Sequence, residues 1–173
     1  METRLVRRLE SVSRGDILAD LEGHVFHITT LASLPAILAA GSVSPNRDGS
    51  LPTAFGGGEG YFRKRGCVSV FDYRQTPPDD PLPYRSRCHP FQPLDVGRGI
   101  AILVLKPTTY PSLISWEGWK KEEVWRQRVV PYVEAGFPGD LPLTEVAEVI
   151  QFEVDEDPQS FRAIVRNARN RTD

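Results

Sequence analysis

The stretch that decides the fold of this chain is His24-Val-Phe-His-Ile-Thr-Thr-Leu-Ala-Ser-Leu-Pro-Ala-Ile-Leu-Ala-Ala-Gly41. It predicts a buried strand followed directly by a short helix. Leu31, Leu34 and Leu38 recur at helical spacing, and Pro35 suits a first helical turn because its ring already fixes φ. Gly41 can adopt the left-handed conformation that commonly ends a helix. The helix therefore has a defined start and end.

The predicted strand covers residues 24–29 and carries two polar side chains that are candidates for function. His27 and Thr29 are two residues apart, so their side chains leave the same face of the strand. One strand face therefore presents a hydrogen-bond donor and acceptor pair.

Length and composition indicate a single soluble domain over residues 1–173. The chain has 173 residues, of which 40% are hydrophobic, enough for one core. A net charge of -2 argues against a broad electrostatic nucleic-acid binder. Local clusters such as Arg63-Lys64-Arg65 and Arg126-Gln-Arg128 could still bind a polynucleotide.

The termini and cysteines give further expectations about location and metals. The N-terminus lacks the apolar segment of a secretory signal, and no apolar run reaches transmembrane length, so we expect a cytoplasmic protein without a membrane partner. Cys67 and Cys88 form no Cys-x-x-Cys pair, which predicts free thiols and no zinc site. His89 beside Cys88 has no further ligands at suitable spacing and is expected in an exposed loop.

Other strands follow from apolar runs, so the expected class is α+β. Residues 67–73 are rich in β-branched and aromatic side chains, and residues 146–154 form another candidate strand. The unbroken apolar run over residues 99–105 predicts a strand at the centre of the sheet.

The helical predictions fall mainly at the two ends of the chain. Residues 1–22 are expected to form an N-terminal helical segment, and residues 157–173 a C-terminal helix opened by Asp157 and Pro158. The segment from Trp116 to Trp125 is expected to be helix or turn, with its tryptophans covering the core.

A long stretch rich in glycine, proline and polar residues, 42–66, follows the first helix. Its Gly56-Gly-Gly-Glu-Gly60 run is not followed by the Gly-Lys-Ser/Thr of a phosphate-binding P-loop, which rejects that motif. A binding loop and simple disorder remain equally weighted interpretations. Arg47, Arg63 and Arg65 are the cations that it could bring to a pyrophosphate or a nucleic-acid backbone.

Two further residues are candidates for a site. Val129-Val-Pro-Tyr-Val-Glu134 predicts a strand that delivers Glu134 at its end, before a turn rich in glycine and proline; the alternative is an ordinary surface glutamate. Tyr73 ends the strand predicted over residues 67–73. A strand aromatic is more often a core residue than a stacking platform, and both interpretations stay open.

These segments resemble the DarT-type ADP-ribosyltransferase toxins that target DNA. Phe26-His27-Ile28-Thr29 matches their (Y/F)-H-I-T strand, and Leu34-Pro-Ala-Ile37-Leu38-Ala-Ala-Gly41 matches their N-L-x-x-I-L-x-x-G helix. Glu134 to Pro142 has the spacing of the E-x-x-V-x-x-x-(V/I/L)-P pattern that carries a catalytic glutamate. Tyr73, Arg74 and Pro77 are loose counterparts of a P-R-S-P turn.

The resemblance implies an ADP-ribosyltransferase-like fold with two small packed β-sheets, flanking helices and a cleft that holds NAD as co-substrate, without a metal. It implies a glycosyltransferase-class enzyme that modifies a nucleic acid, single-stranded DNA or RNA, with an antitoxin or immunity protein as a further partner. Glu134 would be catalytic. The implied NAD-binding residues are His27, Thr29, Ser33 at the position of a nucleotide-binding asparagine, Arg47 or Arg63 at the pyrophosphate, and Tyr73.

Two alternatives share this fold. RNA 2'-phosphotransferases use NAD on a 2'-phosphate and would want several basic residues lining the cleft. A catalytically inactive module that binds a nucleotide or a protein partner would not need Glu134 for its function. Substituting Glu134 separates this second alternative from an enzyme.

Overall fold

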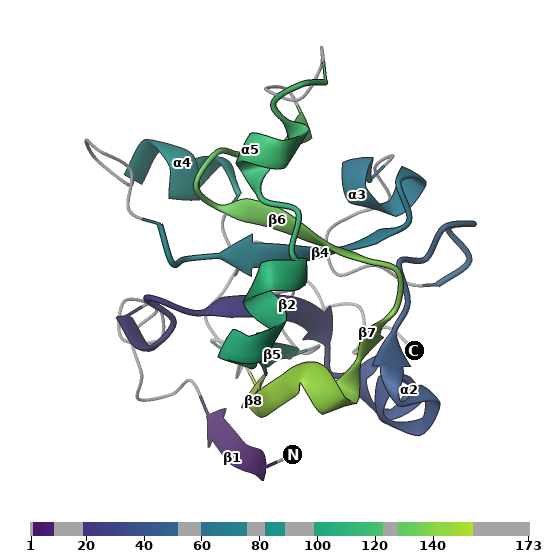
Figure 1. Cartoon of the computed structure of the whole chain (residues 1–173). Coiled ribbons are helices and arrows are strands. Elements are labelled where there is room, and N and C mark those ends of the chain that lie inside the picture. Colours follow the sequence, from purple (N-terminus) through teal and green to yellow (C-terminus); the bar gives the residue numbers. More distant parts are fainter. Residues whose placement is uncertain are drawn as a thin grey trace, which may run out of the picture.

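Figure 1 shows the computed structural model of the chain, drawn with the labels used below. It describes residues 2–8 by their backbone and, with most of their side chains, residues 19–51, 60–75, 82–88, 99–122 and 128–153. Residues 56–59 of the glycine-rich run, Pro77, His89, Trp125 and the predicted C-terminal helix lie outside the described residues.

A twisted antiparallel sheet with strand order β8-β5-β2-β4-β6 forms the centre of the molecule. β5 lies between β8 and β2, and all of its side chains are buried, which confirms the predicted central strand. The strands are β2 (Val25–Thr30), β4 (Cys67–Asp72), β5 (Ile100–Leu105), β6 (Glu134–Pro138) and β8 (Val146–Glu153).

Short strands and helices complete a mixed α+β fold, which confirms the predicted class. β3 (Ser42–Val43) pairs with β7 (Leu141–Pro142) in a separate two-stranded sheet, so the two sheets differ greatly in size. The helices are α2 (Leu34–Ala40), α3 (Tyr61–Lys64), α4 (Leu82–Arg87) and α5 (Trp116–Trp119), with 3-10 turns at Pro107–Ser112 and Leu143–Glu145.

The helix α2 confirms the prediction from the opening stretch. Pro35 lies in its first turn, and Gly41 ends it with φ of 72° while its N–H donates to the carbonyl of Ile37 at 3.0 Å. Leu34 is buried, whereas Leu38 is 42% exposed. The helix therefore packs on the sheet through its first turn.

Two predictions about elements are wrong. Residues 2–8 form the strand β1 (Glu2–Arg8), parallel to β8, and not a helix. Backbone pairing with a sheet edge overrides a weak local helical pattern. Glu134 begins a strand instead of ending one, because a turn at Pro131–Val133 precedes it.

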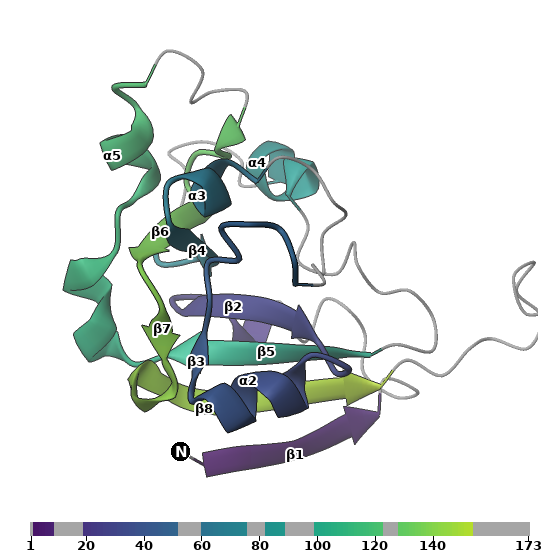
Figure 2. The same cartoon turned by 90° about the vertical axis from the view of Figure 1, so that its right-hand side faces the viewer.

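Buried residues cover both faces of the sheet. Cross-strand partners share a face, so Phe26, Phe71 and Glu134 lie on one side. That face is covered by a core that includes Leu21, Tyr73, Val130, Val133 and Phe152. The opposite face, which carries Val25, packs on α2, β3 and β7 through Leu34, Val43 and Leu141. Figure 2 shows these elements beside the edges of β2, β5 and β8.

The strands β2 and β4 pair only at the first residues of β2. Val25 is opposite Asp72 and Phe26 opposite Phe71, and the register ends there, although β2 stays paired with β5 as far as Thr30. We call this boundary the β2–β4 seam. No helix in the described part of the chain combines the length and apolar character needed to cross a bilayer.

Candidate functional site

Glu134 is the first residue of β6 and is held by the turn that precedes it. Its backbone N–H donates to the carbonyl of Val130 at 3.1 Å, and its carboxylate Oε2 accepts from the N–H of Val130 at 2.7 Å. Residue 131 is proline, which has no N–H to continue a strand ladder. The chain therefore turns at this point, and both the backbone and the side chain of Glu134 are fixed to Val130.

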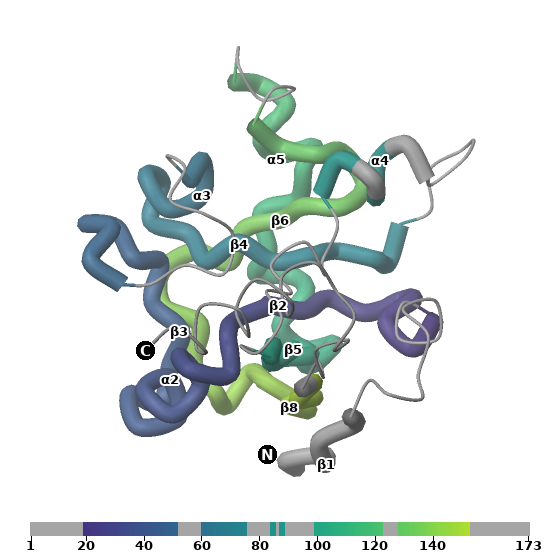
Figure 3. Tube along the Cα trace, turned by 180° about the vertical axis from the view of Figure 1, so that it is seen from behind, coloured from purple at the N-terminus to yellow at the C-terminus, as the bar shows by residue number. Residues whose placement is uncertain are grey.

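The carboxyl group of Glu134 is desolvated, although part of the residue reaches solvent. Burial raises its pKa, and the N–H of Val130, the thiol of Cys88 and the charge of Arg87 partly oppose this effect. Cys88 follows the last residue of α4, and burial together with the nearby Glu134 raises the pKa of its thiol. Figure 3 shows α4 beside the start of β6.

Tyr132 occupies an unusual backbone conformation two residues before Glu134. Its φ is 61°, in the left-handed region that bulky L-residues rarely adopt. Such a residue costs about 1–3 kcal/mol and persists only where its surroundings hold it. The ring of Tyr132 lies 4.6 Å from that of Trp116 and 5.1 Å from that of Tyr84, measured between centroids.

Tyr73 lies in the core on the same face as Glu134. It is 2% exposed, its ring meets that of Phe26 edge-on at 5.0 Å, and the guanidinium of Arg85 lies 4.4 Å from its centroid. Its hydroxyl is buried and has no hydrogen-bond partner among the described residues. Burial raises the pKa of this hydroxyl, and Cys88 is near enough to contribute. Tyr73 and Glu134 therefore both lie close to the end of α4.

His27 lies at the seam. Its Nδ1 donates to the backbone carbonyl of Ser69 in β4 at 2.8 Å, which leaves Nε2 as the acceptor of a neutral ring. Desolvation lowers the pKa of His27 and outweighs the opposing effect of the Ser69 carbonyl. Thr29 is 7% exposed and lies opposite Ala101 of β5. The shared face predicted for His27 and Thr29 follows from this register.

His27 and Glu134 point to opposite faces of the sheet. Phe26 pairs with Phe71, and Phe71 pairs with Glu134, so these three side chains share one face. His27 is the next residue after Phe26, and because successive strand residues alternate, its side chain lies on the other face. Two strand spacings separate the backbones of His27 and Glu134 laterally, about 10 Å. The two residues are thus close in the sheet but are not joined in one contact group.

The register between β2 and β4 ends before Ile28, a residue that is itself only 3% exposed. The carbonyl of His24 accepts from the N–H of Tyr73 at 2.9 Å, so the backbone groups of residues 24, 26 and 28 face β4. Phe26 is the last residue in register with β4. The N–H and C=O of Ile28 therefore face β4 beyond the end of the ladder, next to the ring of His27.

The remaining predicted residues lie elsewhere. Ser33 precedes α2, and its hydroxyl and N–H both contact the hydroxyl of Thr30, at 2.9 and 3.1 Å. Arg47 lies against Gly66, and Arg63 against Gly49. Gly66 precedes β4 at the end where Cys67 pairs with Pro138, four residues or about 13 Å along the strands from Glu134.

The structure adds contacts that the sequence did not predict. Arg87 of α4 and Cys88 just after it reach Glu134, Ser69 contacts His27, and Tyr132 shapes the turn. These contacts join segments far apart in the chain, which no local motif reports. A left-handed tyrosine also carries no sequence signal, because only glycine and asparagine are typical there.

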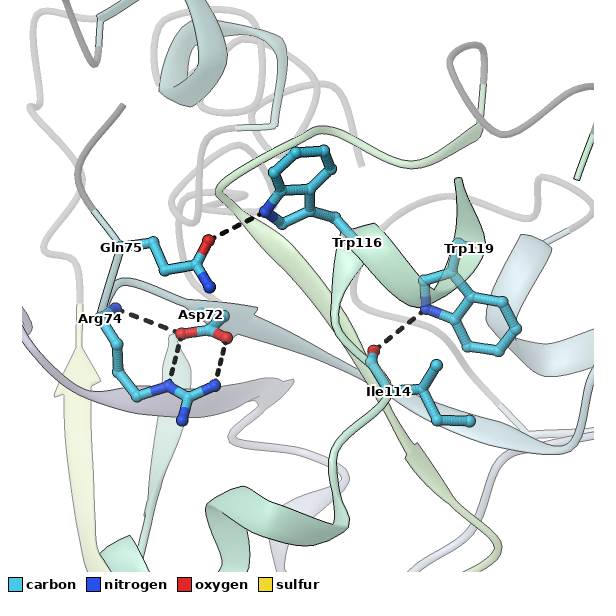
Figure 4. A network of polar contacts seen from close by, with 6 residues as sticks. All are labelled: Asp72, Arg74, Gln75, Ile114, Trp116 and Trp119. Atoms are coloured by element: carbon cyan, nitrogen blue, oxygen red, sulfur yellow. Dashed lines mark hydrogen bonds and ion pairs between the residues drawn. The ribbon is translucent and has the colours of Figure 1, made fainter. Parts of the chain in front are cut away.

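A polar network connects the end of β4 to the segment around α5 (Figure 4). Asp72 accepts from Nε and Nη2 of Arg74 at 2.8 and 2.7 Å, and Arg74 also lies over the ring of Tyr110. The Nε1 of Trp116 donates to the side-chain oxygen of Gln75 at 3.0 Å. Trp116, which contacts Tyr132, is therefore also held in place by its hydrogen bond to Gln75.

Among the described residues, no group of three or more His, Cys, Asp or Glu side chains is placed to hold a metal ion. No family model, curated protein or solved structure matches this chain. Function is therefore inferred from the residues themselves. The features that the described residues offer are a desolvated carboxylate after a strained turn, a neutral histidine at the β2–β4 seam, and arginines at two separate places.

Proposed function

We propose that this chain is an NAD-dependent ADP-ribosyltransferase that modifies a nucleic acid, with Glu134 as its catalytic carboxylate. The observation that carries the proposal is the setting of Glu134: the first residue of a strand, desolvated, and held by the N–H of Val130 at 2.7 Å. Perturbed carboxylates held in this way are more common at functional sites than on ordinary surfaces.

The chemistry needs a fixed negative charge. As neutral nicotinamide leaves NAD, the C–N bond to the ribose breaks and positive charge develops on the ribose carbon. A carboxylate that accepts from the ribose 2'-hydroxyl orients the sugar and stabilises this charge. The low-dielectric surroundings of Glu134 strengthen such an interaction compared with one in water.

The seam is the proposed path of the dinucleotide. His27 and Glu134 face opposite sides, so a ligand that touches both must cross where β2 and β4 separate. Ile28 lies beyond the last registered pair but is only 3% exposed, so in this proposal the seam opens for its N–H and C=O to reach the nicotinamide amide. Nε2 of His27 can accept from a ribose hydroxyl. In this proposal the sheet halves on either side of the seam correspond to the two sheets of an ADP-ribosyltransferase fold.

In this proposal, arginines at two places in the molecule bind different phosphate groups. Arg87 is close enough to Glu134 to affect its pKa and is the candidate for the phosphate nearer the reacting ribose. Arg47 and Arg63, beside the start of β4, are candidates for more distant phosphates of the dinucleotide or of the nucleic acid.

One observation favours a second candidate, a nucleotide-binding or partner-binding module without catalysis. The carboxylate of Glu134 already contacts the N–H of Val130 and the thiol of Cys88, so it could serve only to stabilise the turn. The hydroxyl of Ser33 is likewise engaged with Thr30. In a module of this kind, the loss of the Glu134 charge would change the free energy of unfolding but not the affinity for a nucleotide or partner.

Nicotinamide release from NAD tests the proposal. Wild type, Glu134→Gln and the exposed control Glu117→Gln are compared with no acceptor, single-stranded DNA, RNA or cell lysate. We expect release that depends on a nucleic acid, and a loss of about 10²–10³-fold in Glu134→Gln only. Release without acceptor would indicate NAD hydrolysis. No release, with no NAD-dependent rise in melting temperature, would rule out the NAD proposal and favour the module.

A further inference from the structure

The turn before Glu134 contains the only left-handed aromatic residue among the described residues, Tyr132, with φ of 61°. The turn closes through the carbonyl of Val130, which accepts from the N–H of Val133 at 3.3 Å and of Glu134 at 3.1 Å. An aromatic side chain disfavours this backbone conformation, so other contacts must hold it. The cause lies in what surrounds the ring.

The ring of Tyr132 is held between two others. Trp116 lies 4.6 Å away at a tilt of 49°, and Tyr84 of α4 lies 5.1 Å away at 75°. Trp116 is 8% exposed and is hydrogen-bonded to Gln75, so it cannot move freely. The ring position is therefore set by α4 and α5, and the backbone of Tyr132 follows the ring.

The same turn sets the carboxylate. The N–H of Val130 that holds Oε2 of Glu134 at 2.7 Å belongs to the residue whose carbonyl closes the turn. If Tyr132 relaxed to an ordinary φ, Val130 and Glu134 would separate and this hydrogen bond would be lost. The orientation of the carboxylate thus depends on the side chain of Tyr132, two residues before it in the chain.

We infer that Tyr132 is a positioning residue: its ring, clamped between Trp116 and Tyr84, holds the turn that aims the Glu134 carboxylate. The catalytic consequence rests on the proposed function of Glu134, whereas the structural consequence does not. A displacement of about 1 Å at a reacting group can cost about 10²-fold in rate.

The test uses Tyr132→Phe, which keeps the ring, Tyr132→Ala, which removes it, and Tyr132→Gly, which removes both ring and strain. Tyr110→Ala is the matched control, a half-buried tyrosine on the other face of the sheet. We expect kcat for nicotinamide release to fall about tenfold or more in Tyr132→Ala, with KM for NAD unchanged, and to recover in Tyr132→Gly, because glycine adopts this φ without help from a ring. Phe should retain the wild-type rate.

A second readout does not need activity. Because burial raises the pKa of Glu134, its carboxyl binds a proton more tightly when folded, so the free energy of unfolding falls as pH rises from about 4.3. Glu134→Gln removes this fall. Cys88 and Arg87 of α4 face the same carboxyl and are left unchanged in every variant. We expect the fall to shrink in Tyr132→Ala, as a released carboxylate becomes hydrated, and to persist in Tyr132→Phe and Tyr132→Gly.

The outcomes are separable. If Tyr132→Ala keeps both the full pH-dependent fall and the kcat of Tyr110→Ala, or if Tyr132→Gly is as impaired as Tyr132→Ala, the positioning role is overturned. If Tyr132→Ala does not fold, Tyr84→Ala, which removes one side of the clamp and leaves the strained residue, decides by the same two readouts. If wild type releases no nicotinamide, the proposed function fails while the pH readout still decides the role of Tyr132.

Discussion

Glu134 and Tyr73 lie on the same face of the sheet, but their polar atoms differ in their hydrogen bonding. The carboxylate of Glu134 accepts from the N–H of Val130 and contacts the thiol of Cys88. The hydroxyl of Tyr73 has no partner among the described residues. An unsatisfied buried hydroxyl costs about 1–3 kcal/mol, which a ligand hydroxyl or phosphate could recover on binding. Tyr73 is therefore a core residue that keeps a polar atom available.

The histidine at the seam makes stability depend on pH. Desolvation lowers the pKa of His27, so below about pH 6.5 the unfolded chain takes up a proton more readily than the folded one. The free energy of unfolding should therefore fall on acidification through this range. His27→Gln, which keeps a donor for the Ser69 carbonyl but cannot titrate, should lose this part of the fall.

Urea unfolding between pH 7.5 and 5 measures the effect, with His24→Gln as the control because His24 is exposed. Identical slopes for wild type and His27→Gln would contradict the prediction. NAD titration of the same variants in a thermal melt adds a functional reading, since a ribose-binding role predicts weaker NAD stabilisation in His27→Gln only.

Single-residue predictions from the sequence were reliable where they depended on local geometry. Gly41 adopts its left-handed cap, and the spacing of His27 and Thr29 fixes a shared strand face. The partners of Glu134 could not be predicted in this way. Cys88 and Arg87 reach it from a helix that lies 46 residues earlier in the chain, counting from Cys88 to Glu134. Contacts of this kind depend on the tertiary fold.

At the level of elements, a strand with a continuous apolar run was predicted correctly. A strand whose sequence shows no strand pattern, and which forms only because it pairs with a neighbour, was not. All residues of β5 are buried, so both of its faces require apolar side chains, and the sequence shows this as an unbroken apolar run. β1 pairs only at one edge, with β8, so its sequence Glu-Thr-Arg-Leu-Val-Arg-Arg shows no strand alternation. The β-branched run before Glu134 suggested a strand, but Pro131 and left-handed Tyr132 make it a turn.

The end of β4 depends on one ion pair, which should contribute more than its surface counterparts. The side chain of Asp72 is 5% exposed and accepts two hydrogen bonds from Arg74. Asp72→Ala should lower the free energy of unfolding by about 2 kcal/mol, because it removes charge-assisted bonds and leaves the guanidinium partly buried.

The matched control is Glu122→Ala, which breaks the ion pair with Arg65, where both side chains are about one-third exposed. Pairs of that kind contribute about 1 kcal/mol or less. Equal losses of stability in chemical denaturation of the two variants would show that burial of Asp72 adds nothing.

In the described part of the molecule, the main sheet pairs over only two residues at the β2–β4 seam. β5 pairs along its length with both β2 and β8, and β4 pairs along its length with β6, whereas β2 and β4 share only the register at Val25 and Phe26. The stacked rings of Phe26 and Phe71, 5.2 Å apart, close one end of the seam. Motions that open the sheet should therefore concentrate at the far end of β2.

Hydrogen exchange with and without NAD tests the proposed use of the seam. If the dinucleotide binds there, amides in a peptide covering residues 27–33 should exchange more slowly when NAD is present. A peptide from β8, residues 146–153, is the control because both of its edges are paired. Equal protection of the two peptides, or protection of neither, would place the ligand elsewhere.

The order of the strands along the chain limits how far the seam can open. The chain passes from β2 to β4, back to β5, across to β6 and back to β8, so it crosses the boundary four times. Each crossing is a covalent tether between the halves. The two halves of the sheet can therefore move apart at the seam but cannot dissociate. Neither half is a contiguous segment of the chain, so neither can be expressed as one fragment. For the same reason, a single proteolytic cut in one connection would leave three covalent connections, which would still hold the two halves of the sheet together.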